Sequence, residues 1–177
     1  MPSAGAPADP IAAEPGLLPE AQALVEAFCQ HGASIILGVT GLLDRPLAGV
    51  ALGCTVIGPE RVRVLLSRPS NSELLLGLMR DSRIALTVSE VPTHRSIQIK
   101  GDGAVLLAAQ PEDLRVATRQ LRAFRDQLID AEYGEAFATA YCSFDPTEAV
   151  AVEFVPCAAF TQTPGPKAGE RLEEAAR

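Results

Sequence analysis

The sequence predicts a mostly β fold: a barrel of about six mostly antiparallel strands with helices packed on its outside. Short apolar segments recur along the chain at even spacing. Tight turns with Gly and Pro, rather than repeated crossover helices, separate most of them. A parallel doubly wound sheet would place a helix between successive strands, so the antiparallel barrel is the better interpretation.

The length of 177 residues fits one domain that buries its core without a metal or a disulfide. Residues 1–16 contain four prolines and no Lys or Arg, which predicts a disordered leader rather than a secretory signal. We expect the domain over residues 17–163 and a flexible tail over residues 164–177. No apolar run approaches the ~20 residues that cross a bilayer, so the sequence predicts a cytoplasmic protein with no membrane partner.

The charge and the cysteines exclude several classes of function. A net charge of −7, with Lys100 the single Lys before residue 160, argues against a nucleic-acid partner. The two histidines show no metal-ligand spacing with the cysteines, so we expect no metal site. Four dispersed cysteines without a C-x-x-C pair predict reduced thiols: Cys29, Cys54, Cys142 and Cys157.

The first half of the domain predicts a helix followed by three strands. An amphipathic segment at 19–31 predicts the helix, which His31 and Gly32 close. Apolar runs at 34–40 and 47–57, joined by a turn, predict a hairpin. Alternating residues at 61–66 predict the third strand.

The second half begins with the hydroxyl-rich residues 67–72, which lead into a helix that ends at Asp81. Gly101 and Gly103 predict a bulge or a close backbone approach within a long strand. The remaining elements are two strands, the longest helix and a last strand, at residues 83–90, 94–107, 111–134 and 149–161.

Several features, taken in order and spacing, resemble the pyridoxamine-5′-phosphate-oxidase-like family. They are a hairpin turn with Arg45 and Pro46, a strand that ends at Ser67, a loop helix at 71–80, the residues 83–86, and a strand from Arg95 through Gln98 to Gly101. The likeness covers residues 33–107 and the last strand. It implies an FMN-binding split β-barrel that works as a homodimer on a small molecule, with the cofactor at the interface.

FMN needs three kinds of contact, and the sequence offers candidates for each. Its phosphate needs hydroxyls, backbone N–H groups and a cation near a helix N-terminus, which predicts Ser67, Arg68, Ser70, Asn71 and Ser72. Its ring needs an apolar slot with close backbone approach, which predicts Gly49, Val50, Ala51, Leu52 and Gly53. Its polar edge needs donors, which predicts Arg95, Ser96 and Gln98, with His94 as a substrate contact.

Two residue patterns depart from the family. In family members that bind FMN tightly, the hydroxyl residue of the loop is commonly followed by a Lys that binds the phosphate. Here Glu73 stands in that neighbourhood, and its carboxylate would repel a phosphate dianion. The tail, with Arg171 and Leu172, lacks the Pro of the substrate motif of vitamin-B6 oxidases. Pyridoxamine phosphate is therefore not the expected substrate, and a deazaflavin or haem remains an alternative to FMN.

Simpler interpretations accompany these assignments. Residues 67–72 also suit a turn that caps the next helix, His94 also suits a surface loop, and Cys54 suits a small buried residue. Residues 161–166 fit either a lid over the pocket or a plain exit from the last strand. The sequence thus predicts an FMN-dependent oxidoreductase without an assigned catalytic side chain, or a non-catalytic flavin- or haem-binding protein.

Overall fold

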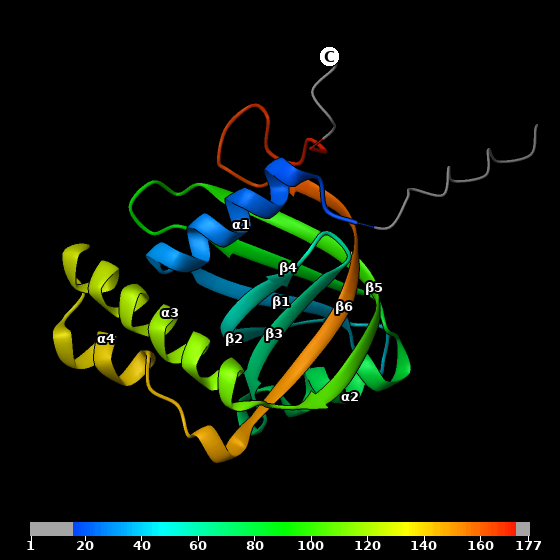
Figure 1. Ribbon diagram of the computed structural model, residues 1–177, viewed down its shortest axis with the longest axis horizontal. Coiled ribbons are helices and arrows are strands. Elements are labelled where there is room, and N and C mark those ends of the chain that lie inside the picture. The colour runs from blue at the N-terminus through cyan, green and yellow to red at the C-terminus, as the bar shows by residue number, and fades with distance from the viewer. Residues whose placement is uncertain (1–15, 173–177) are drawn as a thin grey trace, which may run out of the picture.

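The computed structural model describes residues 16–172 and shows a closed barrel in the strand order β1-β2-β3-β6-β5-β4 (Figure 1). Every pairing between neighbouring strands is antiparallel. The strands are β1 Ser34–Thr40, β2 Pro46–Ile57, β3 Arg61–Ser67, β4 Ile84–Ser89, β5 Ser96–Ala108 and β6 Ala149–Thr161. The predicted antiparallel barrel is confirmed. The predicted leader falls almost entirely on residues 1–15, outside the described residues.

Four helices flank the barrel: α1 Pro19–His31, α2 Ser72–Arg80, α3 Pro111–Asp130 and α4 Glu135–Tyr141. Short 3₁₀ turns cover Pro69–Asn71 and Pro146–Glu148. The helix predicted over residues 111–134 is present but ends earlier, at Asp130, and the separate helix α4 was not predicted. Glu132 adopts a left-handed φ of 65°, which stops the helix, and Gly134 then serves as the N-cap of α4.

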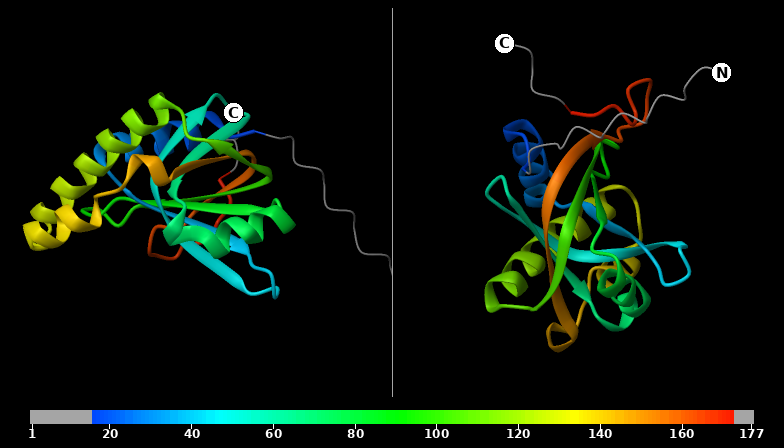
Figure 2. Two further views of the ribbon diagram at one scale, coloured as in Figure 1. Left: turned by 90° about the horizontal axis from the view of Figure 1, so that it is seen from below. Right: turned by 90° about the vertical axis from the view of Figure 1, so that its right-hand side faces the viewer.

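The core lies inside the barrel, where alternate residues of each strand are buried. Helices α1 and α2 lie at opposite ends of the barrel and add Val25, Phe28, Leu74 and Leu78 to the same core (Figure 1). Helix α3 packs along the outside of β2, and the β1–β2 hairpin extends away from α3 and α4 (Figure 2). No helix within residues 16–172 is both long and apolar enough to cross a membrane.

The outer edge of β2 changes partner halfway along its length. Strand β1 pairs with β2 only as far as Val50, and the register of β2 against β3 shifts between Ala51 and Gly53. Beyond this bulge, the buried amide of Gln120 on α3 accepts from the Cys54 N–H and donates to the Cys54 carbonyl, both at 2.8 Å. The Gln120 side chain therefore makes the backbone hydrogen bonds that a neighbouring strand would make at this edge of β2.

Replacing Gln120 with leucine should lower the free energy of unfolding by about 2 kcal/mol. The buried N–H and carbonyl of Cys54 would then lose the hydrogen bonds that they make with the Gln120 amide. Urea unfolding measures this change. Gln30→Leu is the control, since Gln30 is exposed on α1. Equal stability of the two variants would contradict the role given to Gln120.

The predicted irregularity in β5 is confirmed. The register of β5 against β6 shifts between Lys100 and Gly101 and again between Asp102 and Val105. A side chain at Gly101 would begin 2.2 Å from the Phe154 ring, so only glycine fits this crossing. After the bulge, β5 pairs with β6 alone, since β4 pairs with β5 only as far as Gly101.

Part of the segment predicted as a flexible tail packs against the barrel. The N–H groups of Gly169 and Leu172 donate to the carbonyls of Thr161 and Ala159 at 2.7 and 2.8 Å. The Thr163 hydroxyl accepts from the N–H of Ser96 at 3.0 Å. Residues 162–172 thus form a hairpin beside the start of β5. The flexibility of residues 164–177 stays a prediction.

Candidate functional site

One face of the sheet is open on the outside of the barrel. The pairing registers align Val50, Ile36, Thr87, Gln98 and Phe160 in one row across β2, β1, β4, β5 and β6. Ile36 and Val50 stay 37% and 45% exposed, which shows that no described helix covers this part of the face. Large apolar side chains left open in a sheet face indicate a binding or contact surface.

The next row of the same face carries small residues. It aligns Ala48, Gly38, Ala85, Lys100 and Ala158. Above it lies a cavity of about 470 Å³, which we call the sheet trough, with Gly38, Leu47, Arg83, Ala85, Lys100 and Cys157 in its lining. Because Gly38 and Ala85 leave little side-chain volume over this part of the sheet, a flat ring system can lie close to the backbone there.

A second cavity lies where β3 leads into α2. It measures about 270 Å³ and is lined by Leu47, Ala48, Ser70, Asn71, Ser72, Glu73 and Leu74; we call it the loop pocket. Leu47 lines both cavities, and Ala48 of the loop pocket neighbours Gly38 of the trough. The two cavities therefore adjoin at Leu47.

Asn71 holds the loop against β2. Its side chain is 3% exposed, and its Nδ2 donates to the carbonyls of Ser67 at 2.9 Å and Val50 at 3.3 Å. Its Oδ1 lies over Gly49, where a Cβ would come within 1.9 Å, and this oxygen has no donor among the described residues. Asn71 thus brings the predicted loop together with the predicted strand, and Gly49 makes room for it.

The loop pocket fits a phosphate poorly, although the trough fits a planar ring. Glu73 lines the pocket, and no Lys or Arg is among its lining residues. Arg68, the predicted phosphate cation, is exposed and does not line the pocket; its backbone N–H donates to the carbonyl of Glu148 at 3.0 Å. Ser67 does not line the pocket either, and its hydroxyl lies 3.5 Å from that of Ser70, which does. The pocket therefore has predicted hydroxyls, from Ser70 and Ser72, but its lining has no cation that could pair with a phosphate.

Three residues of the expected ring slot face away from the open surface. Ala51 is buried in the barrel core, Leu52 packs against the group around Leu65 and Ala117, and a Cβ on Gly53 would lie 2.9 Å from Ala117 on α3. This corrects the assignment of Ala51, Leu52 and Gly53 to the ring. The bulge after Ala51 puts Gly53 together with Leu52 on the side that α3 covers. Gly49 lies under Asn71, so Val50 alone of the five predicted residues remains on the open face.

Cys54 also lies in the interior. A hydrogen bond with the Cys29 thiol and burial raise the pKa of Cys54 well above its ordinary value. A thiol held protonated is a poor nucleophile. Cys54 is therefore a buried core residue, as the sequence predicts, while Cys157 lines the trough and was not singled out by the sequence.

The predicted donors Arg95 and Ser96 lie far from the loop pocket. Gln98 stands on the open face, where its Nε2 donates to Thr87 at 3.3 Å. Arg95 lies 5.1 Å over the Phe28 ring, and His94 occupies the β4–β5 turn with a φ of 56°. Strand β4 runs from the α2 end to this turn and spans roughly 20 Å. Within one chain, these residues do not meet the loop.

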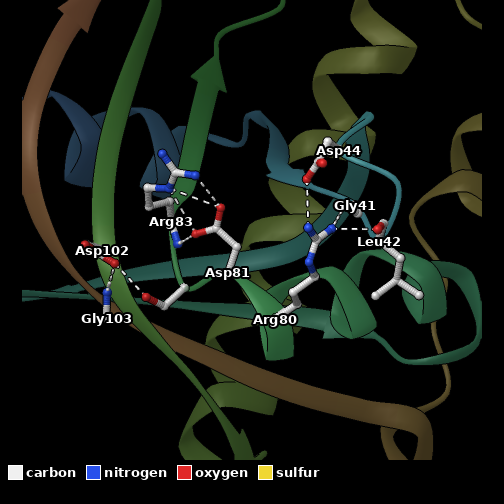
Figure 3. A network of polar contacts seen from close by, with 9 residues as sticks. Gly41, Leu42, Asp44, Arg80, Asp81, Arg83, Asp102 and Gly103 are labelled. Carbon is white, nitrogen blue, oxygen red and sulfur yellow. Dashed lines mark hydrogen bonds and ion pairs between the residues drawn. The ribbon is translucent and has the colours of Figure 1, made fainter.

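A charged network fixes the α2 end of the trough (Figure 3). The Arg80 guanidinium donates to the carbonyl of Leu42 at 2.6 Å and to Asp44 at 2.9 Å, which ties α2 to the β1–β2 turn. Hydrogen bonds from Arg83 lower the pKa of Asp81 to about 2. These contacts orient Arg83 at the trough edge, a position that the sequence alone did not single out.

Comparison with known proteins identifies the fold class. The chain is similar to an F420 reductase structure, with a TM-score of 0.52 and 13% identity over 76% of this chain and 94% of that one. A Clostridium acetobutylicum protein related to general stress protein 26 of B. subtilis, of the pyridoxinephosphate oxidase family, gives 0.51 and 11% over 89% and 97%. HupZ of Group A Streptococcus gives 0.50 and 8% over 86% and 99%.

At these identities, the likeness establishes the fold alone. The chain therefore has the split β-barrel fold of pyridoxamine-5′-phosphate-oxidase-like proteins, as its sequence predicts. No family model matches the sequence, and no curated protein matches it.

Proposed function

We propose that the protein is a flavin-dependent oxidoreductase that acts on a small molecule, with the flavin ring on the sheet trough. The observation that carries this proposal is the open row of small residues at Ala48, Gly38 and Ala85, which adjoins a hydroxyl-lined pocket. A flat ring with a hydroxylated side chain matches this pair of cavities. Similar structures named for a reductase and for an oxidase family support the same class.

In this arrangement the flavin supplies the electron transfer, and the protein positions it. The trough floor shields one face of the ring from water. The Gln98 amide offers a donor to the polar edge of the ring, and Lys100 places a positive charge in the lining, 4.8 Å from the Phe160 ring. FMN is the flavin that the sequence predicts, with a deazaflavin as the alternative.

The proposal includes a homodimer with the ligand at its interface. The open face carries the apolar side chains Ile36 and Val50, which a second copy would bury. The loop pocket and the predicted donors Arg95 and Ser96 lie at opposite ends of β4, so one chain does not offer both to one ligand. A two-fold partner can place its own β4–β5 end against this loop.

The purified protein is expected to bind a flavin and to elute at the mass of a dimer. Visible absorption, flavin titration and light scattering after gel filtration measure these properties. Paired flavin bands that bleach with dithionite support the proposal. A monomer that binds no flavin would contradict it, and a Soret band would favour the haem-binding alternative.

A further inference from the structure

Resting on this proposed function, we propose that the loop pocket takes the hydroxyls of an uncharged polyol chain rather than a phosphate. The protein would then prefer riboflavin, or another flavin that ends in a neutral chain, over FMN. The residues around the pocket carry the inference through their charge and their hydrogen-bonding capacity.

The pocket offers acceptors that need donors from a ligand. The Glu73 carboxylate accepts hydrogen bonds only, and the hydroxyls of Ser70 and Ser72 can accept or donate. Hydroxyl groups of a polyol can donate to all three side chains. A phosphate dianion has only acceptor oxygens, so against Glu73 it would meet repulsion and no hydrogen bond.

The N-terminus of α2 does not restore a preference for anions. Free N–H groups and the helix dipole favour negative charge at such an end. Glu73 lies in the first turn of α2, however, so the helix carries its own anion at this position. A phosphate bound there would have to share the weak positive partial charge of the helix N-terminus with the Glu73 carboxylate.

Of the nearby cations, Arg68 is exposed and does not line the loop pocket, and the others pair with carboxylates or line another cavity. Arg80 and Arg83 form ion pairs with Asp44 and Asp81 at 2.9 and 2.6 Å. Arg45 lines a neighbouring cavity together with Glu73 and apolar residues, and it does not line the loop pocket. The net charge of −7 adds to the same unfavourable field for a dianion.

The test compares riboflavin and FMN in titrations followed by flavin fluorescence. The wild-type protein should bind riboflavin about tenfold more tightly than FMN at low salt, because a −1 charge and a −2 charge several ångströms apart in a wet site repel to that extent. Raising the salt concentration should narrow the difference. The ratio of the two affinities is the quantity to follow.

Glu73→Lys should strengthen FMN binding by about tenfold or more and leave riboflavin binding within a few fold. Glu60→Lys changes the net charge equally in the exposed β2–β3 turn and should leave the ratio unchanged. Glu73→Gln, a milder change, should move the ratio in the same direction as Glu73→Lys.

The outcomes separate this inference from the proposed function. Tighter binding of FMN than of riboflavin by the wild-type protein would overturn the inference while keeping a flavin protein. Equal effects of Glu60→Lys and Glu73→Lys would overturn it too, since they would show a long-range charge effect. If neither riboflavin nor FMN binds to the wild-type protein or to Glu73→Lys, the proposed function itself is overturned.

Discussion

Replacing Gly38 with leucine is expected to weaken flavin binding by about 10- to 100-fold while the barrel still folds. An added Cβ at Gly38 would meet no atom closer than 3.8 Å, and Gly38 is not among the glycines with positive φ, so strand β1 accepts a side chain there. The leucine would fill the trough, and forcing atoms into filled space costs about 1–3 kcal/mol. Fluorescence titration measures the affinity, and a thermal melt verifies the fold.

Gly134→Leu is the matched control for this change. Gly134 precedes α4 with a φ of −59° and has open space around it, but it lies outside the trough. Flavin affinity should stay unchanged in this variant. If Gly38→Leu folds and binds flavin as well as the control does, the ring does not lie on the trough.

The barrel could be predicted because its signals are local. Alternation of apolar residues along a strand and Gly or Pro in a turn depend on a few neighbouring positions. The end of α3 at Asp130 and the separate helix α4 were missed, because a non-glycine residue, Glu132, takes the left-handed conformation that stops α3. Glutamate rarely adopts the left-handed conformation, so the residue type of Glu132 does not predict it.

The candidate site was predicted only in part, for a related reason. The hydroxyl-rich loop is contiguous in sequence and could be found. The trough floor has Gly38 and Ala85 beside Ala48 of the loop pocket, and only the pairing register brings these residues of three strands into one row. The bulge after Ala51 likewise depends on the β2–β3 pairing, so the sequence misplaced Gly53 on the open face.

Arg63→Ala is expected to lower the free energy of unfolding by about 3 kcal/mol, because it leaves the mostly covered carboxylate of Asp113 without its guanidinium partner. Arg63 on β3 donates to both oxygens of Asp113 on α3 at 2.8 Å and contacts Glu153 on β6 at 3.3 Å. Its side chain is 14% exposed, and those of Asp113 and Glu153 are 12% and 13% exposed. The melting temperature should fall by roughly 6–12 °C.

Arg61→Ala is the control, since Arg61 contacts the same Glu153 at 2.8 Å but is 62% exposed. Exposed pairs contribute at most about 1 kcal/mol, so this variant should stay close to the wild type. If Arg63→Ala and Arg61→Ala lose the same free energy of unfolding, burial of the Arg63 contacts is not what stabilises the barrel wall.

The effect of Arg63→Ala should also depend on pH. Burial raises the pKa of Asp113, but hydrogen bonds from the Arg63 side chain and the Gln110 N–H outweigh it, and the pKa lies below the ordinary value of 3.8. A lowered folded-state pKa contributes stability that is complete above the unfolded value and is lost as the pH falls through the folded one. The gap between wild type and variant should therefore be widest near about pH 7 and should narrow below about pH 4. Urea unfolding at several pH values measures the gap, and a gap that stays constant on acidification would show that Asp113 is not the group that Arg63 stabilises.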